Sequence, residues 1–254
     1  MRILLTNDDG ILAPGILAAK AALDEIADVF VIAPERQRSA AGHAITLHKP
    51  LRLMPTTLPD GSTGHACSGT PTDCVTLGFE IVMENRCDLV ISGINAGANL
   101  GWDLTYSGTV SAAIEGAVLG ASSFAISLVL ENGGPMPMDF GPAATFAARL
   151  ARKLTETSLP HATLLNVNVP HRAESDLKGV TVTHQGRREY IDRIVAREDP
   201  SGRPYYWLAG SLREDVPDPG SDVHAILQDR IAVTPIHLDM TAYSFQDAVR
   251  AWRL

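Results

Sequence analysis

The sequence predicts a doubly wound α/β fold with a mostly parallel sheet, helices on both faces of that sheet, and a β-rich C-terminal extension. Short apolar runs of strand length alternate with longer amphipathic segments in the first two thirds of the chain. Strands separated by helix-length segments pair in parallel, because a crossover helix returns the chain to the same end of the sheet. The last third carries strand-like runs joined by charged turns instead.

The first strand–helix–strand unit is predicted from apolar runs and a proline. Residues 2–7 contain a short run of large apolar side chains, which is typical of a buried strand. Residues 16–26 can place their apolar side chains on one face of a helix. The next apolar run, 29–33, is a strand that ends at Pro34, because proline has no N–H to donate to a neighbouring strand.

A helix start at Thr70 is a strong local signal. Thr70 can cap the first turn, Pro71 suits the first helical position, and Asp73 stands where a capping box needs an acid. The helix is expected to continue over 74–83. The same alternation predicts the other core elements, which are strands at 88–92, 124–129 and 164–169 and helices at 109–119 and 143–154.

The 254 residues are expected to form one large domain with an appendage. We predict an α/β catalytic core at 1–170. Residues 171–254 are predicted to be a β-rich extension that serves oligomerisation or rejoins the core. Its expected elements are strands at 180–184, 190–196, 205–208 and 231–236, a loop at 215–220, a helix at 221–227 and a short final helix with Trp252.

Composition and charge exclude several classes of protein. Hydrophobic residues make up 45% and charged residues 20% of the chain, which is ordinary for a globular domain and excludes a disordered one. Lys and Arg number 21 against 29 Asp and Glu, so the net charge is −8. Duplex nucleic acid attracts clustered positive charge, and we therefore expect no such partner.

Hydropathy and cysteine usage predict a soluble cytoplasmic protein. No stretch approaches the ~20 apolar residues of a membrane helix, and the apolar run at the N-terminus is too short for a signal peptide. We therefore expect no membrane partner. The three cysteines form no CxxC pair, which is typical of free thiols in a reducing compartment.

Two adjacent acids, Asp8 and Asp9, follow the first predicted strand. Ligands of doubly wound sheets bind beyond the carboxyl ends of the strands, so the residues after Asn7, Ala33 and Ser92 should carry the chemistry. Two neighbouring carboxylates repel each other unless a cation, a proton or hydrogen-bond donors compensate. Hard oxygen ligands suit Mg²⁺ or Mn²⁺, whereas the alternative is a solvated Asp-Gly turn.

The same segment excludes one mechanism. An aspartyl-phosphate phosphatase carries DxDxT after its first strand, and here Gly10 stands where the second acid is required if Asp8 were the nucleophile. After the second strand, Ser39 can offer a hydroxyl ligand and Arg36 or Arg38 can meet an anion. Taken alone, that loop is better explained as ordinary surface.

A long loop rich in glycine and asparagine follows the third strand. Gly93, Gly97 and Gly101 permit close backbone approach to a ligand, and the asparagines between them supply donors and acceptors. Ser107-Gly108-Thr109 opens the next helix, whose free N–H groups form an anion site. The spacing matches neither GxGxxG nor GxxxxGK[ST]. The alternative is a long loop with a capped helix, but loops of this length are usually functional.

These motifs resemble the SurE survival-protein family of metal-dependent nucleotidases. The resemblance is carried by TNDDG, SAAGHAIT, GTPTDCV, SGINAGANLGWDLTYSGTVSAAIEG and TPIHLDMT, and it is densest up to about residue 120. It implies a Rossmann-like core and a phosphomonoesterase that hydrolyses nucleoside 5′- and 3′-monophosphates, with short polyphosphate as a further substrate of some members. It also implies homodimers or homotetramers with exchanged C-terminal elements.

Carried over to this chain, the resemblance implies one divalent cation, Mg²⁺ or Mn²⁺, per subunit. The implied metal ligands are Asp8, Asp9, Ser39 and Asn95. The implied phosphate-side residues are Asn99, Ser107, Gly108 and Thr109. Two departures are a bulky Trp102 at the expected pocket mouth and Ile236 where the family pattern has Leu.

Several roles stay open on sequence grounds. Asp8 or Asp9 is the expected base for the attacking water, and His43 is a candidate leaving-group acid, although a structural role is the commoner fate of such a histidine. The rival to an enzyme is a non-catalytic nucleotide- or sugar-phosphate-binding module. A transferase would need a second substrate cleft, and none is evident. The aromatic residues that could stack a base, or pack in an interface, are Trp102, Tyr106, Tyr205, Tyr206 and Trp207.

Overall fold

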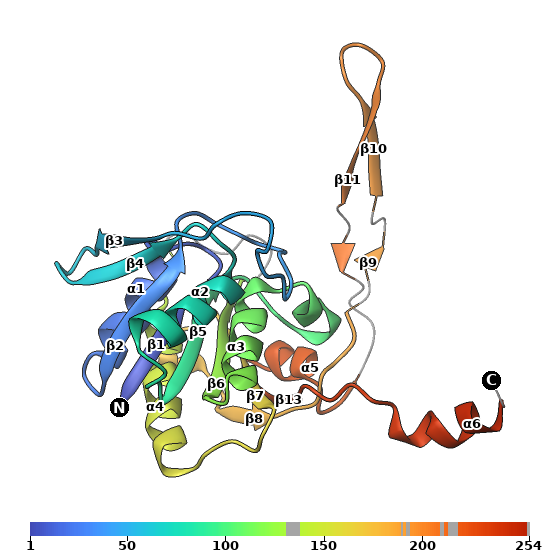
Figure 1. The fold of residues 1–254 in the computed structure, drawn as a ribbon. Coiled ribbons are helices and arrows are strands. Elements are labelled where there is room, and N and C mark those ends of the chain that lie inside the picture. Colours follow the sequence, from blue (N-terminus) through green and yellow to red (C-terminus); the bar gives the residue numbers. More distant parts are fainter. Residues whose placement is uncertain (131–137, 189, 192–193, 209–210, 213–217, 253–254) are drawn as a thin grey trace.

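The computed structural model describes residues 1–130, 138–188, 190–191, 194–208, 211–212 and 218–252. Figure 1 shows a layered body from which a β-hairpin projects and a C-terminal helical segment extends to one side. Among the described residues, the main sheet has nine strands in the order β3-β4-β2-β1-β5-β6-β7-β13-β8. Their bounds are β1 Arg2–Thr6, β2 Asp28–Pro34, β3 Leu53–Thr57, β4 Thr63–Cys67, β5 Leu89–Ala96, β6 Ser122–Val129, β7 Thr163–Pro170, β8 Val180–Val182 and β13 Ile231–His237.

Parallel pairing dominates the sheet, as predicted. β1 pairs in parallel with both β2 and β5, and the parallel series continues through β6 to β7. The two antiparallel pairs of this sheet in the described residues are β3 with β4 and β13 with β7. Since β1 lies between β2 and β5, the three strand ends predicted to carry chemistry are neighbours at one edge of the sheet.

Helices cover both faces of the sheet (Figure 1). Ile3 and Leu5 face a core formed with α1 (Pro14–Leu23) and α4 (Gly141–Glu156), whereas Leu4 faces the opposite core, formed with α2 (Pro71–Leu77) and α3 (Gly108–Val118). This alternation explains why the strands read as continuous apolar runs, because both faces are buried. The α/β prediction is therefore confirmed. The other helical elements are η1 Gly78–Val82, η2 Gly101–Thr105, η3 Glu174–Asp176, α5 Asp222–Leu227, η4 Tyr243–Phe245 and α6 Gln246–Ala251.

Some elements differ from the prediction. The helix expected over 74–83 is α-helical to Leu77 and continues as the π-helical turn η1. β5 runs beyond 92 to Ala96, and β3 and β4 were not predicted. The sequence of β3 and β4 lacks a continuous apolar run, and none of the five β3 residues is buried. Only pairing with β2 turns this segment into sheet.

The C-terminal third divides between the main sheet and a projecting part. β13 and β8 join the main sheet. The predicted strand 190–196 is described as two strands, β9 (Tyr190–Ile191) and β10 (Ile194–Glu198). β10 pairs with β11 (Pro204–Leu208) and β9 with β12 (Ser211–Leu212), and together they form the projecting hairpin in Figure 1. Of the predicted loop 215–220, residues 215–217 lie outside the described residues.

Two further observations concern the cysteines and the length of the helices. The three cysteines are free, and Cys67 and Cys74 are buried. None of the helices in the described ranges combines the length and the apolar character needed to cross a bilayer.

Candidate active site

Asn7 makes the turn that brings the two acids out of β1. Its side chain is fully buried. Its Oδ1 accepts a 3.1 Å hydrogen bond from the Gly10 N–H, and its Nδ2 donates to the Gly10 carbonyl at 2.9 Å. Gly10 has φ +106°, in the left-handed region that favours glycine. Asp8 and Asp9 are therefore held in a tight turn at the carboxyl end of the strand.

Asp8 lies against the first turn of α3. It is 4% exposed, and its Oδ1 accepts a 2.6 Å hydrogen bond from the Thr109 hydroxyl. A β-carbon built on Gly108 would lie 2.9 Å from Asp8 Cβ, so only glycine allows the helix to approach this closely. Burial raises the pKa of the Asp8 carboxyl above its ordinary value, and the Thr109 hydrogen bond acts in the opposite direction.

Asp9 connects the loops that follow β2 and β5. Its Oδ2 accepts a 3.1 Å hydrogen bond from the Ala96 N–H, and its Oδ1 accepts one of 3.3 Å from Gln37 Nε2. The same Gln37 nitrogen donates to Ser39 Oγ at 2.9 Å. Gln37 therefore holds the Ser39 hydroxyl beside Asp9. Burial raises the pKa of the Asp9 carboxyl as well.

Asn95 lies near the end of β5, just after an irregularity in the strand. The register of β5 against β6 shifts between Ser92 and Asn95, as in a β-bulge. Asn95 Nδ2 donates a 2.9 Å hydrogen bond to the Gly97 carbonyl. The amide nitrogen thus donates to the backbone. The amide oxygen is the atom of the Asn95 side chain that can bind a cation. The next residue, Ala96, is the one that holds Asp9.

Ser107 begins α3 as its N-cap. Ser107 Oγ accepts a 3.1 Å hydrogen bond from the Val110 N–H. The first turn of the helix, which contains Gly108 and Thr109, lies beside Asp8. A helix N-terminus of this length attracts anions, because its first N–H groups have no partner within the helix and its dipole is positive there.

Asn99 is buried and held by other strands. Its Nδ2 donates to Ser127 Oγ at 2.8 Å, and its backbone N–H donates to Asn168 Oδ1 at 2.9 Å. Its carbonyl accepts hydrogen bonds from Asn166 Nδ2 and Asn168 Nδ2. These hydrogen-bond partners of Asn99 all lie on β6 and β7.

The structure brings most of the predicted site residues to one edge of the sheet. Asp8, Gly108 and Thr109 touch, and Gln37 and Ala96 link Asp9 to Ser39 and to the neighbour of Asn95. No group of three His, Cys, Asp or Glu side chains able to hold a metal occurs in the described part of the chain. A cation at Asp8 and Asp9 would therefore need the neutral oxygens of Ser39 and Asn95.

His43 is engaged by α3 rather than by the two acids. Its Nε2 lies 2.9 Å from Glu115 Oε2, and Glu115 Oε1 accepts a 2.9 Å hydrogen bond from the Thr76 hydroxyl. The hydrogen bond with His43 is the main reason why the pKa of Glu115 lies below its usual value. These contacts favour a structural role for His43, and its role as leaving-group acid stays a prediction.

The candidate base-stacking residues separate into two places. Trp102 and Tyr106 are exposed at η2, and the Arg187 guanidinium lies 4.8 Å from the centre of the Trp102 ring. The other three are exposed on the projecting hairpin, far from the end of β1 in Figure 1; they are Tyr205, Tyr206 and Trp207.

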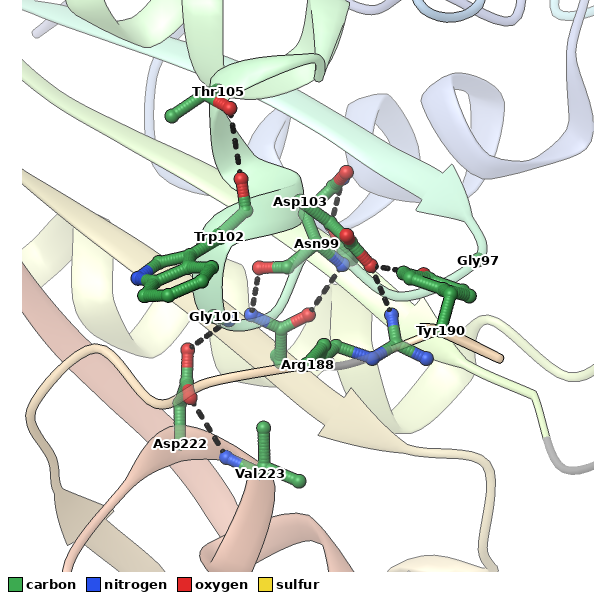
Figure 2. Close-up of polar contacts among 12 residues, drawn as sticks. Gly97, Asn99, Gly101, Trp102, Asp103, Thr105, Arg188, Tyr190, Asp222 and Val223 are labelled. Carbon is green, nitrogen blue, oxygen red and sulfur yellow. Dashed lines mark hydrogen bonds and ion pairs between the residues drawn. The ribbon is translucent and has the colours of Figure 1, made fainter. Parts of the chain in front are cut away.

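Sequence reasoning did not identify several residues that organise the site. Asn166 and Asn168 alternate along β7 and so share one face, and this pattern within an apolar strand could have marked them. Gln37, which contacts Asp9, carries no comparable local signal. The same is true of Asp222, whose contact with Gly101 in the loop after β5 appears in Figure 2.

Comparisons with known proteins identify the family of the chain. The family model described as "Survival protein SurE" matches residues 3–192. The protein named 5′-nucleotidase SurE of Symbiobacterium thermophilum is 50% identical over 256 residues, which cover 99% of this chain and 98% of that protein. The protein of the same name from Moorella thermoacetica is 47% identical over 253 residues, covering 99% and 96%.

A solved structure shows the same fold. The crystal structure of the Sure protein from Aquifex aeolicus is similar with a TM-score of 0.87 and 38% sequence identity, and the match covers 100% of both chains. The agreement thus extends beyond the N-terminal motifs to the hairpin and the C-terminal segment. This chain belongs to the SurE family.

Proposed function

We propose that this protein is a divalent-metal-dependent phosphomonoesterase that hydrolyses nucleoside monophosphates to nucleoside and phosphate. The names of its relatives support 5′-monophosphates as substrates. The 3′-monophosphates and short polyphosphate are proposed from the sequence resemblance. One observation carries the proposal: two adjacent carboxylates, the buried Asp8 and the half-buried Asp9, stand at the carboxyl end of β1, and Asp8 lies against the first turn of α3.

The carboxylates fit a cation better than any other partner. Burial raises the pKa of both groups, which means that the protein alone disfavours their charged forms. Within the described residues, their partners are N–H and O–H donors, and no Lys, Arg or His forms an ion pair with them. A purely phosphate-binding site has no reason to present such negative charge. We propose one Mg²⁺ or Mn²⁺ at Asp8 and Asp9, with Ser39 and Asn95.

The proposed site has a cation side and a phosphate side. A bound cation would supply a Lewis acid for a phosphate oxygen and would lower the pKa of a water. Asp8 or Asp9 would accept the proton of the attacking water. On the other side, the first turn of α3, with Ser107, Gly108 and Thr109, would bind the remaining phosphate oxygens, and Asn99 would complete that side.

We propose that the protein acts as a homodimer or homotetramer. Exposed apolar side chains gather on the hairpin and on the C-terminal segment, and such surfaces usually mark protein interfaces. Contacts of these parts with a second copy would bury them. The side chains concerned are Ile194, Tyr206, Trp207 and Leu208 on the hairpin and Tyr243, Phe245 and Trp252 at the C-terminal end. The cytoplasmic location and the lack of nucleic-acid and membrane partners stay predictions from the sequence.

A substrate panel tests the activity. Purified protein is assayed with a chromogenic phosphomonoester and with nucleoside 5′- and 3′-monophosphates, with Mg²⁺, with Mn²⁺ and with chelator. We expect hydrolysis that requires added cation and is abolished by the chelator. Binding of nucleotide without release of phosphate under any of these conditions would instead identify a non-catalytic binding module.

The Asp9→Ala variant shows whether the activity belongs to this site. We expect it to lose at least about 100-fold in kcat, because a cation ligand and a candidate base are removed. Without metal its melting temperature should rise, since a half-buried carboxylate next to Asp8 is gone. Mn²⁺ should stabilise the wild-type protein but not the variant. Near-wild-type turnover of Asp9→Ala in metal-controlled buffer would contradict the assignment.

A further inference from the structure

Asp222 is a buried carboxylate that touches the loop after β5 but lies outside the predicted site. It is fully buried at the first position of α5. Its Oδ2 accepts a 2.8 Å hydrogen bond from the Gly101 N–H, as Figure 2 shows, and its Oδ1 accepts bonds of 2.9 Å from the Gly186 N–H and 2.8 Å from the Val223 N–H. All three partners are donors, so the arrangement requires a group with acceptors only.

Both backbone polar groups of Gly101 are hydrogen-bonded to the C-terminal part of the chain, the N–H to Asp222 and the carbonyl to Gln185. Gln185 Nε2 donates a 3.0 Å hydrogen bond to the Gly101 carbonyl. Gly101 has φ +54°, and a β-carbon on it would lie 2.9 Å from the Gly186 carbonyl oxygen. The loop after β5 and the segment after β8 are thus in backbone contact, and Asp222 bridges them.

Asp103 provides a second attachment between the same two segments. Its Oδ2 accepts a 2.7 Å hydrogen bond from Arg188 Nη1 and a short one from the Tyr190 hydroxyl (Figure 2). Tyr190 begins β9, at the base of the projecting hairpin. The segment that leads into the hairpin is therefore hydrogen-bonded to the loop after β5 at two places, Gly101 and Asp103.

The loop after β5 connects two of the proposed phosphate-side residues, Asn99 and Ser107. Two residues before Gly101, the backbone of Asn99 is held by Asn168 on β7. After Gly101, the chain passes through η2 to Ser107, where α3 begins. The three groups that donate hydrogen bonds to the Asp222 carboxylate belong to Gly101, Gly186 and Val223, and none of these is a proposed metal ligand.

We propose that Asp222 is a positioning residue for substrate phosphate. By holding Gly101, it maintains the spacing between Asn99 and the N-terminus of α3, and it leaves the cation side of the site unaffected. This inference rests on the proposed function, and it extends that function to a residue more than 100 positions from the loop it holds.

The Asp222→Asn variant releases Gly101 selectively. An amide of the same shape has one acceptor oxygen, which can serve Gly186 and Val223 together. Its NH₂ group then faces the Gly101 N–H, where two donors cannot bond. The matched control is Asp199→Asn at the turn of the hairpin, where the carboxylate also accepts backbone N–H groups, from Ser201 at 2.8 Å and Arg203 at 3.0 Å.

The test compares kcat and KM for a nucleoside 5′-monophosphate, Mn²⁺ binding by calorimetry, and hydrogen exchange of peptides covering 99–106. For Asp222→Asn we expect KM to rise about tenfold or more, since small displacements of binding groups are costly. Its Mn²⁺ affinity should stay within about twofold of wild type, because its contacts avoid the metal side. Exchange over 99–106 should be faster. Asp199→Asn should match wild type in all three measurements.

Other results would overturn the inference. An unchanged KM with faster exchange would show that Asp222 only stabilises the loop, and an equal loss of Mn²⁺ affinity would show a general collapse of the site. If Asp222→Asn does not fold, Tyr190→Phe loosens the same loop at Asp103 and should raise KM without changing Mn²⁺ affinity. An unchanged KM in that variant also contradicts the inference. A wild-type protein that hydrolyses no phosphomonoester overturns the proposed function first, and the inference with it.

Discussion

The Thr109 hydroxyl donates a 2.6 Å hydrogen bond to Asp8 Oδ1, and both side chains are buried. Asp8 leaves the end of β1, and Thr109 lies in the first turn of α3, so the bond joins the proposed cation side to the proposed phosphate side. The bond stabilises the ionised carboxylate and so opposes the effect of burial on the pKa of Asp8. Thr109 would thus keep a metal-ligand candidate charged and oriented.

Replacing Thr109 by Val should weaken cation binding. Val keeps the shape of the side chain but removes the hydroxyl, so the pKa of Asp8 should rise further and its carboxylate should lose its orientation. A hydrogen bond to a charged group of this kind implies about tenfold weaker Mn²⁺ binding by calorimetry. Thr109→Ser keeps the hydroxyl and should bind Mn²⁺ like wild type. The proposed role would be wrong if Thr109→Val bound Mn²⁺ as tightly as Thr109→Ser.

Ser107 has two possible contributions, and two substitutions separate them. Its Oγ caps α3 through the Val110 N–H, and we propose that it also contacts phosphate. Ser107→Ala removes both contributions and should lower stability by about 1 kcal/mol, whereas Ser107→Gly should cost only a few tenths because glycine is a tolerable N-cap. If the hydroxyl contacts phosphate, both variants raise KM to a similar extent. A KM raised in the Ala variant alone would assign the effect to helix capping.

The Glu115–His43 contact should make stability depend on pH in the acidic range. The hydrogen bond with His43, aided by that from Thr76, holds the pKa of Glu115 below its usual value of 4.5. A lowered pKa in the folded state stabilises the protein above the unfolded value, and this stabilisation is lost as pH falls through the folded pKa. Glu115→Gln should therefore be less stable than wild type by about 1 kcal/mol near pH 6. Denaturant unfolding should show this difference shrinking toward pH 3, and a constant difference would contradict the assignment.

The sequence predicted those elements that depend on residues close together in the chain or on a continuous apolar run. The capping box at Thr70 is present with both of its hydrogen bonds, because it needs only Thr70 and Asp73, three residues apart. The strands of the parallel core were recognisable because both of their faces are buried. β3 escaped prediction, since its side chains are largely exposed and its state depends on pairing with β4.

The sequence by itself determined which polar groups stand at the ends of the strands, and parallel topology then required Asp8, Asp9 and the loop after β5 to meet. The tertiary structure alone decided what holds them there. Gln37 beside Asp9 and Asp222 beside Gly101 leave no local pattern, and the second pair is separated by 121 positions. A hydrogen bond depends on the positions of two atoms in space, and only the packed sheet brings such distant residues within bonding distance.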